Sequence, residues 1–378
     1  MLVILLIILL IVGVVAVKIF VMWKQLQRCN QQPLDIKTFD GSDSPYHPAV
    51  LYFKDGWNGY KYWMAETPFS PKAQPYPDRF ECPTIHVSND GVNWTHIGEE
   101  LKPIDDLTEQ EEKELDYFSD PHLVFVDGRM ECWYRFTHRH GDKSDTSFVE
   151  LCRRTTADGV HWSEREVLID LLHSEVGNRF SNMVVSPAIL REGDKYCMWY
   201  VNSETRAQRE VHMSISADGY VWGEIVHCKL IGHNLNPWHI DVNYIDDRYY
   251  LVCYEKSLTL WESEDGVEFI YKKQLLDVGT IGSFYGYWLY RAVLIKDDKY
   301  KLYFSGNNCF HTYIGLMEGD RVDEMEIISP TVERYSSVWD MLHLEYLLEK
   351  RRIVFIVKNT IRNIIKKIKN KLCKENQI

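Results

Sequence analysis

The sequence lacks the short motifs that mark several large enzyme classes. It contains no glycine-rich phosphate loop, which excludes the common nucleotide-binding enzymes, and no Gly-x-Ser-x-Gly elbow, which excludes the usual α/β-hydrolase nucleophile. Its nine cysteines include no Cys-x-x-Cys pair, so no zinc ribbon or thioredoxin-like redox site is predicted.

Positive charge is also scarce over most of the chain. The formal net charge is −12; when the +3 of Lys18, Lys24 and Arg28 and the net +9 of residues 350–378 are set aside, the remainder carries −24. A surface of that sign repels polyanions, which excludes nucleic acid as a general partner. Neutral and cationic sugars remain compatible ligands, and a local basic patch could still hold an anionic group.

What the chain has instead is a repeated pattern of short apolar runs, seen most clearly in residues 120–162. Three runs alternate apolar and polar residues, Asp-Gly turns follow the first and the third, and a fourth short run closes the unit. Period-two runs bounded by such turns predict four antiparallel strands. The runs are 121–126, 130–136, 148–153 and 166–169.

This unit occurs five times along the chain, at spacings of roughly 40 to 70 residues, which is typical of propeller blades. The first strands begin at Pro48, Pro121, Pro187, His239 and Arg291, and the second strands at Tyr60, Met130, Tyr196, Tyr249 and Tyr300. The Asp-Gly turn recurs in the first four copies, followed each time by Trp94, Trp162, Trp222 or Phe269. The sequence therefore predicts an all-β fold, a five-bladed β-propeller of four-stranded antiparallel blades over residues 45–335.

The N-terminal segment is apolar and long enough to cross a membrane as a helix, which we predict for residues 2–23. A cleaved signal peptide is the alternative, but no Lys or Arg precedes the run and no small-residue cleavage site follows it. Residues 24–44, rich in Gln, Pro, Gly and Ser, are predicted to be a linker.

Three features place the propeller on the cytoplasmic side of that membrane. Basic residues follow the apolar segment and none precedes it. The cysteine count is odd, as expected for reduced thiols. Residues 338–378 predict a basic amphipathic helix suited to an anionic leaflet. Two alternatives stay open: the tail could pack on the propeller edge, and propellers of sugar chemistry are often exported. The basic residues of the tail are Lys350, Arg351, Arg352, Lys358, Arg362, Lys366, Lys367, Lys369, Lys371 and Lys374.

The innermost strand of each blade lines the central channel of a propeller, so the loops at one end of these strands gather on one face. The residues predicted to converge there are polar or aromatic, as a sugar site requires. The alternative for each polar residue is a local hydrogen bond at a strand end. The polar set comprises His47, Glu66, Glu81, Asp120, Arg135, His138, Ser186, Asn202, His239, Asp241, Glu255, Arg291, Ser305 and Asn307, and the aromatic set Trp57, Trp63, Trp238, Tyr287, Trp288 and Tyr290.

The stretch Ser119-Asp120-Pro121-His122, the proline at the head of the early first strands, and the segments 47–53, 56–64 and 88–94 resemble the five-bladed propellers of glycoside hydrolase families 43 and 32, and most closely their uncharacterised members. The resemblance covers about residues 44–330. It implies the propeller fold and cleavage or transfer of a glycosidic bond. In family 43 it also implies three acids, one from each of the first three blades.

Only part of that acid set can be carried over. Asp120 matches the acid-tuning aspartate of the second blade, whereas His47 and Ser186 stand where the first and third acids are expected. Glu81-Cys82 resembles the Glu-Cys of family 32 but belongs to the first blade. Inverting hydrolysis needs two carboxyl groups about 6.5 to 9.5 Å apart. The carboxylates able to supply such a pair are Glu66, Glu81, Asp120, Asp241 and Glu255.

We therefore predict a membrane-anchored propeller that cleaves or transfers a glycosidic bond of a cell-surface polysaccharide or its lipid-linked precursor. Asp120 would tune or orient, Glu81 or Glu66 would be the acid, and Asp241 the base. Two alternatives stay open, a non-catalytic glycan-binding or scaffold propeller in polysaccharide biosynthesis and a protein-interaction propeller. The predicted substrate-binding residues are His47, Arg135, His138, Ser186, Asn202, His239, Glu255, Trp288, Arg291 and Asn307.

The same set includes residues that could ligate a metal, namely His47, His138, His239 and Asp241. Histidines in a sugar site also hydrogen-bond hydroxyls or simply pack. The sequence alone therefore predicts no metal and no other cofactor, with a calcium ion in the channel as the alternative.

Overall fold

The computed structural model describes residues 10, 12–20, 31–70, 81–141, 147–180, 184–205, 208–279, 283–308 and 311–328. Residues 12–20 are helical. No helix within these ranges is long and apolar enough to cross a membrane. The rest of the predicted 2–23 span, the start of the 24–44 linker and the whole 338–378 tail lie outside the described residues.

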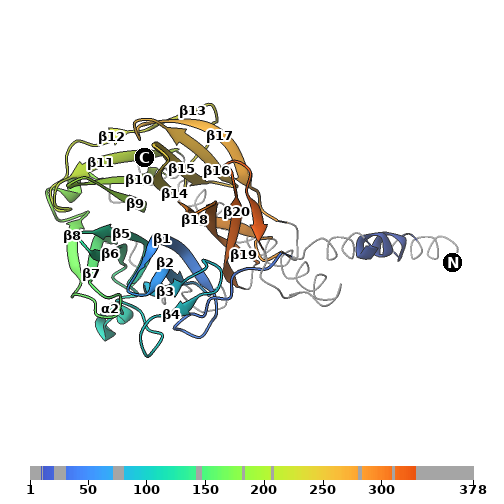
Figure 1. Ribbon diagram of the computed structural model, residues 1–378, viewed down its shortest axis with the longest axis horizontal. Helices are drawn as coiled ribbons and strands as arrows, with labels where there is room; N and C mark the ends of the chain where they lie inside the picture. Colours follow the sequence, from blue (N-terminus) through green and yellow to red (C-terminus); the bar gives the residue numbers. More distant parts are fainter. Residues whose placement is uncertain are drawn as a thin grey trace, which may run out of the picture. The chain divides into compact units, whose positions relative to one another are not determined.

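The described residues between 31 and 328 form five sheets arranged in a ring, so the predicted five-bladed propeller is confirmed (Figure 1). Blade 1 is β1 (Pro45–Trp57), β2 (Tyr60–Pro68), β3 (Thr84–Ser88) and β4 (Thr95–His96); blade 2 is β5 (Tyr117–Val126), β6 (Arg129–His138), β7 (Phe148–Thr156) and β8 (Glu166–Asp170). Blade 3 is β9 (Val184–Glu192), β10 (Lys195–Thr205), β11 (Gln208–Ser216) and β12 (Val226–His227). Blade 4 is β14 (His239–Ile245), β15 (Arg248–Tyr254), β16 (Leu258–Ser263) and β17 (Glu268–Leu276), with β13 (Lys229–Ile231) added; blade 5 is β18 (Trp288–Lys296), β19 (Tyr300–Asn307), β20 (Thr312–Gly319) and β21 (Glu326–Ile328). Within the described ranges, two short helices lie between strands, α2 (Glu109–Lys113) and η2 (Gly177–Arg179).

Blade 4 departs from the predicted four-stranded antiparallel pattern. The strand β13 pairs in parallel with β17, with Lys229 opposite Glu268, and makes this sheet five-stranded. The segment that leaves the edge of blade 3 at β12 thus continues onto the edge of blade 4. An outermost strand presents unpaired backbone groups, and β13 satisfies those of β17.

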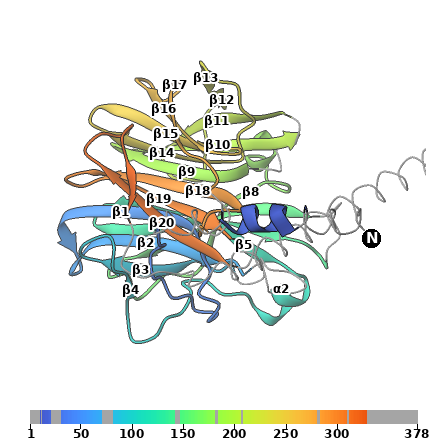
Figure 2. The same ribbon diagram turned by 90° about the vertical axis from the view of Figure 1, so that its right-hand side faces the viewer.

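The first strand of each blade, β1, β5, β9, β14 or β18, is the innermost, and these five strands contact one another around the axis. Figure 2, turned by 90°, shows their length running along that axis. Bulges interrupt the pairing of β1 between Tyr46 and Ala49 and of β5 between Ser119 and His122. His47, Asp120 and Ser186 have φ of 48°, 52° and 51°. Such bulges re-aim side chains, and these three residues form part of the site described below.

The Asp-Gly turns hold neighbouring blades together. Gly159 of blade 2 has φ of +80°, and a Cβ there would lie 2.2 Å from the Trp63 ring of blade 1. Gly219 against Trp133, Gly266 against Trp199 and Gly91 against Tyr303 repeat this contact around the ring. Only glycine combines this backbone conformation with so close an approach. The repeated turn that revealed the blades in the sequence is therefore an inter-blade contact.

Candidate active site

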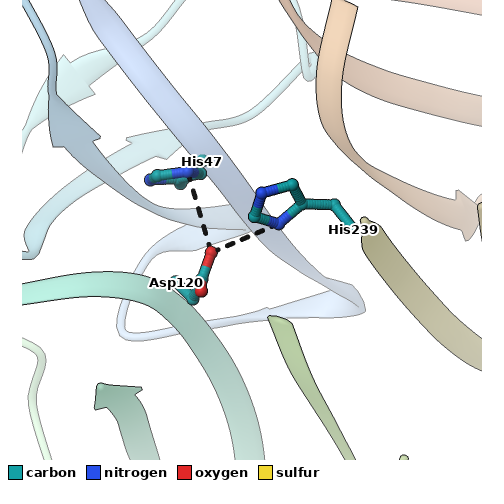
Figure 3. Close-up of side chains that lie close together, drawn as sticks. All are labelled: His47, Asp120 and His239. Carbon is teal, nitrogen blue, oxygen red and sulfur yellow. Dashed lines mark ion pairs between the residues drawn. The ribbon is translucent and has the colours of Figure 1, made fainter. Parts of the chain in front are cut away.

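Asp120 lies at the centre of the residues that converge on the axis. Its Oδ1 atom is 3.7 Å from Nε2 of His47 and 3.4 Å from Nδ1 of His239 (Figure 3). All three side chains are buried, and they come from the inner strands β1, β5 and β14. We call these three residues the central cluster.

The other carboxylate oxygen of Asp120 is held by the protein. Its Oδ2 accepts hydrogen bonds from Nη1 of Arg135 and from the backbone N–H of Ser186, both at 3.2 Å. Burial by itself raises the pKa of Asp120, but His239 and His47, in their protonated forms at low pH, and the guanidinium groups of Arg135 and Arg291 at every pH lower it well below its usual range. Asp120 is therefore an ionised carboxylate, unsuited to donate a proton.

Both histidines of the central cluster are neutral. Burial lowers the pKa of His47 to about 4, although the Asp120 carboxylate opposes this shift. Burial also lowers the pKa of His239 well below its ordinary value. Nδ1 of His47 lies 3.0 Å from Oγ1 of Thr67 and 3.2 Å from Oε2 of Glu81. A proton on Nδ1 would be donated to one of these two oxygens, which would leave the lone pair of Nε2 available to a cation beside Asp120.

The central cluster has the properties of a metal site. Its three candidate ligand atoms lie within 4.8 Å of one another. Oδ1 of Asp120, Nε2 of His47 and both ring nitrogens of His239 are buried, with no hydrogen-bond partner among the residues that the structure describes. Two neutral imidazoles and one carboxylate are the ligand types of a catalytic divalent metal such as Zn²⁺. The residues present therefore fit such an ion.

A second layer of buried polar residues surrounds Arg291, whose Nη1 lies 3.9 Å from Oδ1 of Asp120. Its Nη2 donates to the carbonyl of Pro187 at 3.0 Å and lies 3.3 Å from Nδ1 of His122. Oδ1 of Asp241 lies 3.8 Å from the same His122 nitrogen. Burial raises the pKa of Asp241 to about 6, opposed by Arg291. Arg291 thus links Asp120 to this layer.

A pocket of about 470 Å³ opens next to the central cluster and includes His47 in its wall. Six of the ten lining residues are aromatic, and two are carboxylates, Glu81 and Glu255. An aromatic pocket with a few polar groups is typical of sugar sites. The lining residues are Tyr46, His47, Phe69, Glu81, Arg209, Trp238, Tyr254, Glu255, Trp288 and Tyr290.

Two tyrosine hydroxyls in this pocket are oriented by tryptophans. Nε1 of Trp238 donates to the hydroxyl of Tyr290 at 3.0 Å, and Nε1 of Trp288 donates to that of Tyr46 at 3.1 Å. The two tyrosine rings stack at 4.7 Å, and the Tyr290 ring lies 3.9 Å from that of His239. Burial raises the pKa of both tyrosines, so both keep their protons. Because each hydroxyl oxygen accepts a hydrogen bond from an indole N–H, its own proton remains available for donation to a ligand.

The sequence was compared with protein families and with characterised proteins. No protein-family model matches the chain. The sequence is 28% identical over 300 residues to the A type blood N-acetyl-alpha-D-galactosamine deacetylase of Flavonifractor plautii, which corresponds to 66% of this chain. The chain spans 37% of the length of that relative.

Solved structures share the fold. The crystal structure of an N-acetylgalactosamine deacetylase from F. plautii in complex with blood group B trisaccharide has a TM-score of 0.65 and 21% identity, covering 78% of this chain and 95% of that one. A glycoside hydrolase has a TM-score of 0.57 at 13% identity, and the family 117 glycoside hydrolase Zg3597 of Zobellia galactanivorans 0.52 at 14%, each covering 80% of this chain and 94% of the other. The chain is a five-bladed β-propeller with glycoside hydrolases among its structural neighbours.

The structure brings together many of the residues predicted from the sequence. His47, Asp120, Ser186, His239 and Arg291 come from the heads of the five inner strands and lie around the axis. Arg135 contacts Asp120, Glu81 contacts His47, and Glu255 and Trp288 line the pocket.

Other predicted residues lie elsewhere. Glu66 is buried 3.1 Å from Nε2 of His86 inside blade 1, and Asp241 belongs to the second layer around Arg291. His138 lies between Asp116 and Glu150 in blade 2. None of these three lines the pocket beside the central cluster. Two further predicted residues are also absent from its lining, Asn202, whose Oδ1 accepts from the Glu204 N–H, and Asn307, which is buried in β19.

The predicted aromatic residues divide in the same way. Trp238, Trp288 and Tyr290 line the pocket. Trp57 and Trp63 pack on each other at 4.7 Å in the core between blades 1 and 2, so their predicted contact with sugar is not supported by their positions. Tyr287 packs against Trp288 at 4.5 Å.

Several residues of the site were missed. Tyr46 and Tyr254 each precede a predicted site residue, His47 or Glu255, and line the pocket beside it. Phe69 and Arg209 lie at irregular strand ends, and Arg209 reaches the pocket by placing its guanidinium 4.3 Å from the Trp238 ring. His122 follows Asp120-Pro121 on the same inner strand, which was a usable signal.

Proposed function

We propose that this chain is a metal-dependent carbohydrate deacetylase that hydrolyses the N-acetyl group of an amino sugar. The observation that carries the proposal is the central cluster, because its ligand atoms are buried, neutral or anionic as a metal requires, and lack hydrogen-bond partners in the described part of the chain. The deacetylase activity of the F. plautii relative supports the reaction, and its N-acetyl-alpha-D-galactosamine is the substrate we propose.

His47, Asp120 and His239 are the residues that would hold the ion. When bound, a divalent ion supplies Lewis-acid polarisation of an acyl oxygen and a lowered pKa of a water molecule. Other residues of the site orient the Asp120 carboxylate. Arg135 and the Ser186 N–H fix one oxygen of Asp120, which leaves the other directed at the two histidines.

The pocket supplies binding and proton transfer. Trp238, Trp288 and Tyr46 would offer rings and a hydroxyl to the sugar. We assign to the Tyr290 hydroxyl, which accepts from Trp238, a hydrogen bond donated to the acetyl carbonyl oxygen. Of the two pocket carboxylates, Glu81 contacts the central cluster through His47. We assign to Glu81 the role of general base, which removes a proton from the attacking water. Glu81 then donates this proton to the leaving nitrogen as the C–N bond breaks, which yields acetate and the free amine.

Cleavage of a glycosidic bond is the second candidate function. It is favoured by the two carboxylates, Glu81 and Glu255, that line one pocket. Asp120 would not be its acid, since its carboxylate stays ionised. Membrane attachment through residues 2–23 and 338–378, a cytoplasmic propeller and a lipid-linked substrate remain proposals from the sequence.

The test is to incubate the full-length chain with an oligosaccharide that ends in α-linked N-acetylgalactosamine, and to measure released acetate and new reducing ends separately. We expect acetate, its loss on chelation, and its recovery on adding back Zn²⁺ or Mn²⁺. Asp120→Asn should lower the rate at least about 100-fold, since loss of even an outer partner of a metal ligand costs 10- to 100-fold. His161→Gln, a change at an exposed histidine, is the control. New reducing ends without acetate would establish the glycosidase instead.

A further inference from the structure

A second group of metal-ligating side chains lies on the outer part of blade 3, away from the central cluster. Glu210 and His212 belong to β11, and His227 belongs to β12. Oε2 of Glu210 lies 3.1 Å from Nε2 of His212 and 3.2 Å from Nδ1 of His227. We call these three residues the outer cluster.

The sheet geometry produces this grouping directly. Glu210 and His212 are two residues apart on one strand, so their side chains lie on the same face. His227 is the direct cross-strand partner of His212 in the antiparallel pair, which brings their rings to 4.2 Å between centroids. Directly opposed residues of antiparallel strands have their Cβ atoms about 4.5 to 5.5 Å apart. Three ligand side chains are therefore positioned by backbone pairing rather than by a loop.

Hydrogen bonding around His212 fixes which nitrogen it presents. Nδ1 of His212 lies 3.4 Å from the hydroxyl of Tyr200, a buried residue of β10. Nε2 is then the nitrogen that faces the Glu210 carboxylate. A ligating histidine typically has its other ring nitrogen bound in this manner. The side chain of His212 is 6% exposed, whereas that of His227 is 69% exposed, so one flank of the outer cluster is open to water.

The outer cluster differs from the ordinary surface pairs of this protein. His161 with Asp158, and His173 with Asp170, each join one histidine to one carboxylate three residues away. In the outer cluster two imidazole nitrogens face a single carboxylate oxygen, and all three ligand atoms lie within 4.8 Å of one another. A cation between the three groups would bind all of them at once.

We propose that Glu210, His212 and His227 bind a divalent transition metal ion, Zn²⁺ being the best match. Two imidazoles and a carboxylate are zinc ligands, and the exposed flank admits water as the fourth. This site is distinct from the central cluster and is not required for the proposed deacetylation. Its role is structural. His227 lies two residues before β13, which pairs with β17 of blade 4, so the ion would fasten the edge of blade 3 beside the crossing between the two blades.

The experiment uses the full-length chain, freed of metal with a chelator, loaded with Zn²⁺ alone and passed through gel filtration, after which bound zinc is counted by atomic emission. The Asp120→Asn background disables the central cluster. In that background we expect one zinc per chain, and none after His227→Gln or Glu210→Gln. His161→Gln, the matched exposed histidine, should keep the one zinc.

A second measurement reports the ligands themselves. With Cu²⁺ in the Asp120→Asn background, electron paramagnetic resonance should show coupling to two nitrogens, falling to one in His227→Gln. The proposal is overturned if Asp120→Asn retains no zinc, or if His227→Gln retains as much as its parent. In the otherwise unchanged chain, His227→Gln should leave acetate release intact, so failure of the outer cluster and failure of the proposed function give different results.

Discussion

The Nε2 atom of His47 and the Oδ1 atom of Asp120 face each other at 3.7 Å, beyond hydrogen-bond distance, in a fully buried site. A buried polar atom without a partner costs about 1 to 3 kcal/mol, so two of them favour a ligand that satisfies both. Arg135 and Arg291 hold Asp120 in place, so the arrangement does not relax by a simple rotation of the carboxylate.

The first prediction concerns the stabilising effect of a metal. At a free Zn²⁺ concentration 100 times Kd, one bound ion should raise the free energy of unfolding by about 2.7 kcal/mol, because it binds the folded chain. The measurement is urea denaturation in the His227→Gln background, where the outer cluster contributes nothing. Adding Asp120→Asn should abolish the increase. An equal increase in both proteins would show that the ion binds elsewhere.

The second prediction concerns the hydroxyl of Tyr290. Tyr290→Phe should lower kcat for acetate release by about 10²- to 10³-fold, the effect of losing one donor to a developing oxyanion. KM should change far less, because the ring remains. Tyr254→Phe is the control, since that ring lines the same pocket. Equal losses in the two variants would remove the special role of Tyr290.

The third prediction tests the inter-blade turn. Gly159→Ala should destabilise the fold by about 2 to 5 kcal/mol, combining a left-handed backbone with overpacking against Trp63. Gly193→Ala is the matched control: its φ is +60°, but nothing lies within 4 Å of the added Cβ, so only the backbone penalty of about 1 to 2 kcal/mol applies. Urea denaturation of both variants measures the difference, and equal losses would contradict the packing role.

The fourth prediction concerns pH and stability. Burial alone would lower the pKa of His138, but hydrogen bonds to Asp116 and Glu150 raise it to about 9. The flanking Arg139 and His140 do not prevent this shift. Because the folded-state pKa exceeds the unfolded value of about 6.5, the stabilisation is complete below pH 6.5 and is lost as pH rises through 9.

This stabilisation can be measured as a slope. Between pH 6.5 and 9, His138 should contribute at most about 1.4 kcal/mol per pH unit to the fall in the free energy of unfolding. His138→Gln should flatten the curve in that window, whereas His161→Gln, at an exposed histidine, should not. A wild-type curve that is flat from pH 6.5 to 9 would contradict the raised pKa.

Much of the fold was predictable because the propeller repeats a local pattern. Period-two runs and Asp-Gly turns identify strands without knowledge of distant contacts, and the repeat then aligns His47, Asp120, Ser186, His239 and Arg291 at equivalent strand heads. The fifth strand of blade 4 was not predictable, because β13 is three residues long and is defined by its partner rather than by its own sequence.

The candidate site was harder to predict for a physical reason. In a strand, neighbouring side chains point to opposite faces, so an error of one residue exchanges a pocket residue for a core residue. Glu66 is predicted as the residue that leaves the second strand of blade 1, but β2 continues to Pro68, and Glu66 faces His86 inside its own blade. The metal-ligand character of His47, Asp120 and His239 depends on distances across three blades, which one-dimensional spacing does not contain.

The order of the blades also bears on how the protein is made. Each blade is one continuous segment, and blade 5 meets blade 1 through contacts such as that of the Tyr303 hydroxyl with the Gly91 carbonyl at 2.9 Å. During synthesis His47, Asp120 and His239 leave the ribosome before Tyr290 and Arg291. A nascent chain that ends before blade 5 thus carries every ligand of the central cluster but lacks the ring that covers His239 and the guanidinium that links Asp120 to the second layer. Catalytic competence would therefore arise late and all at once, when the last blade docks on the first.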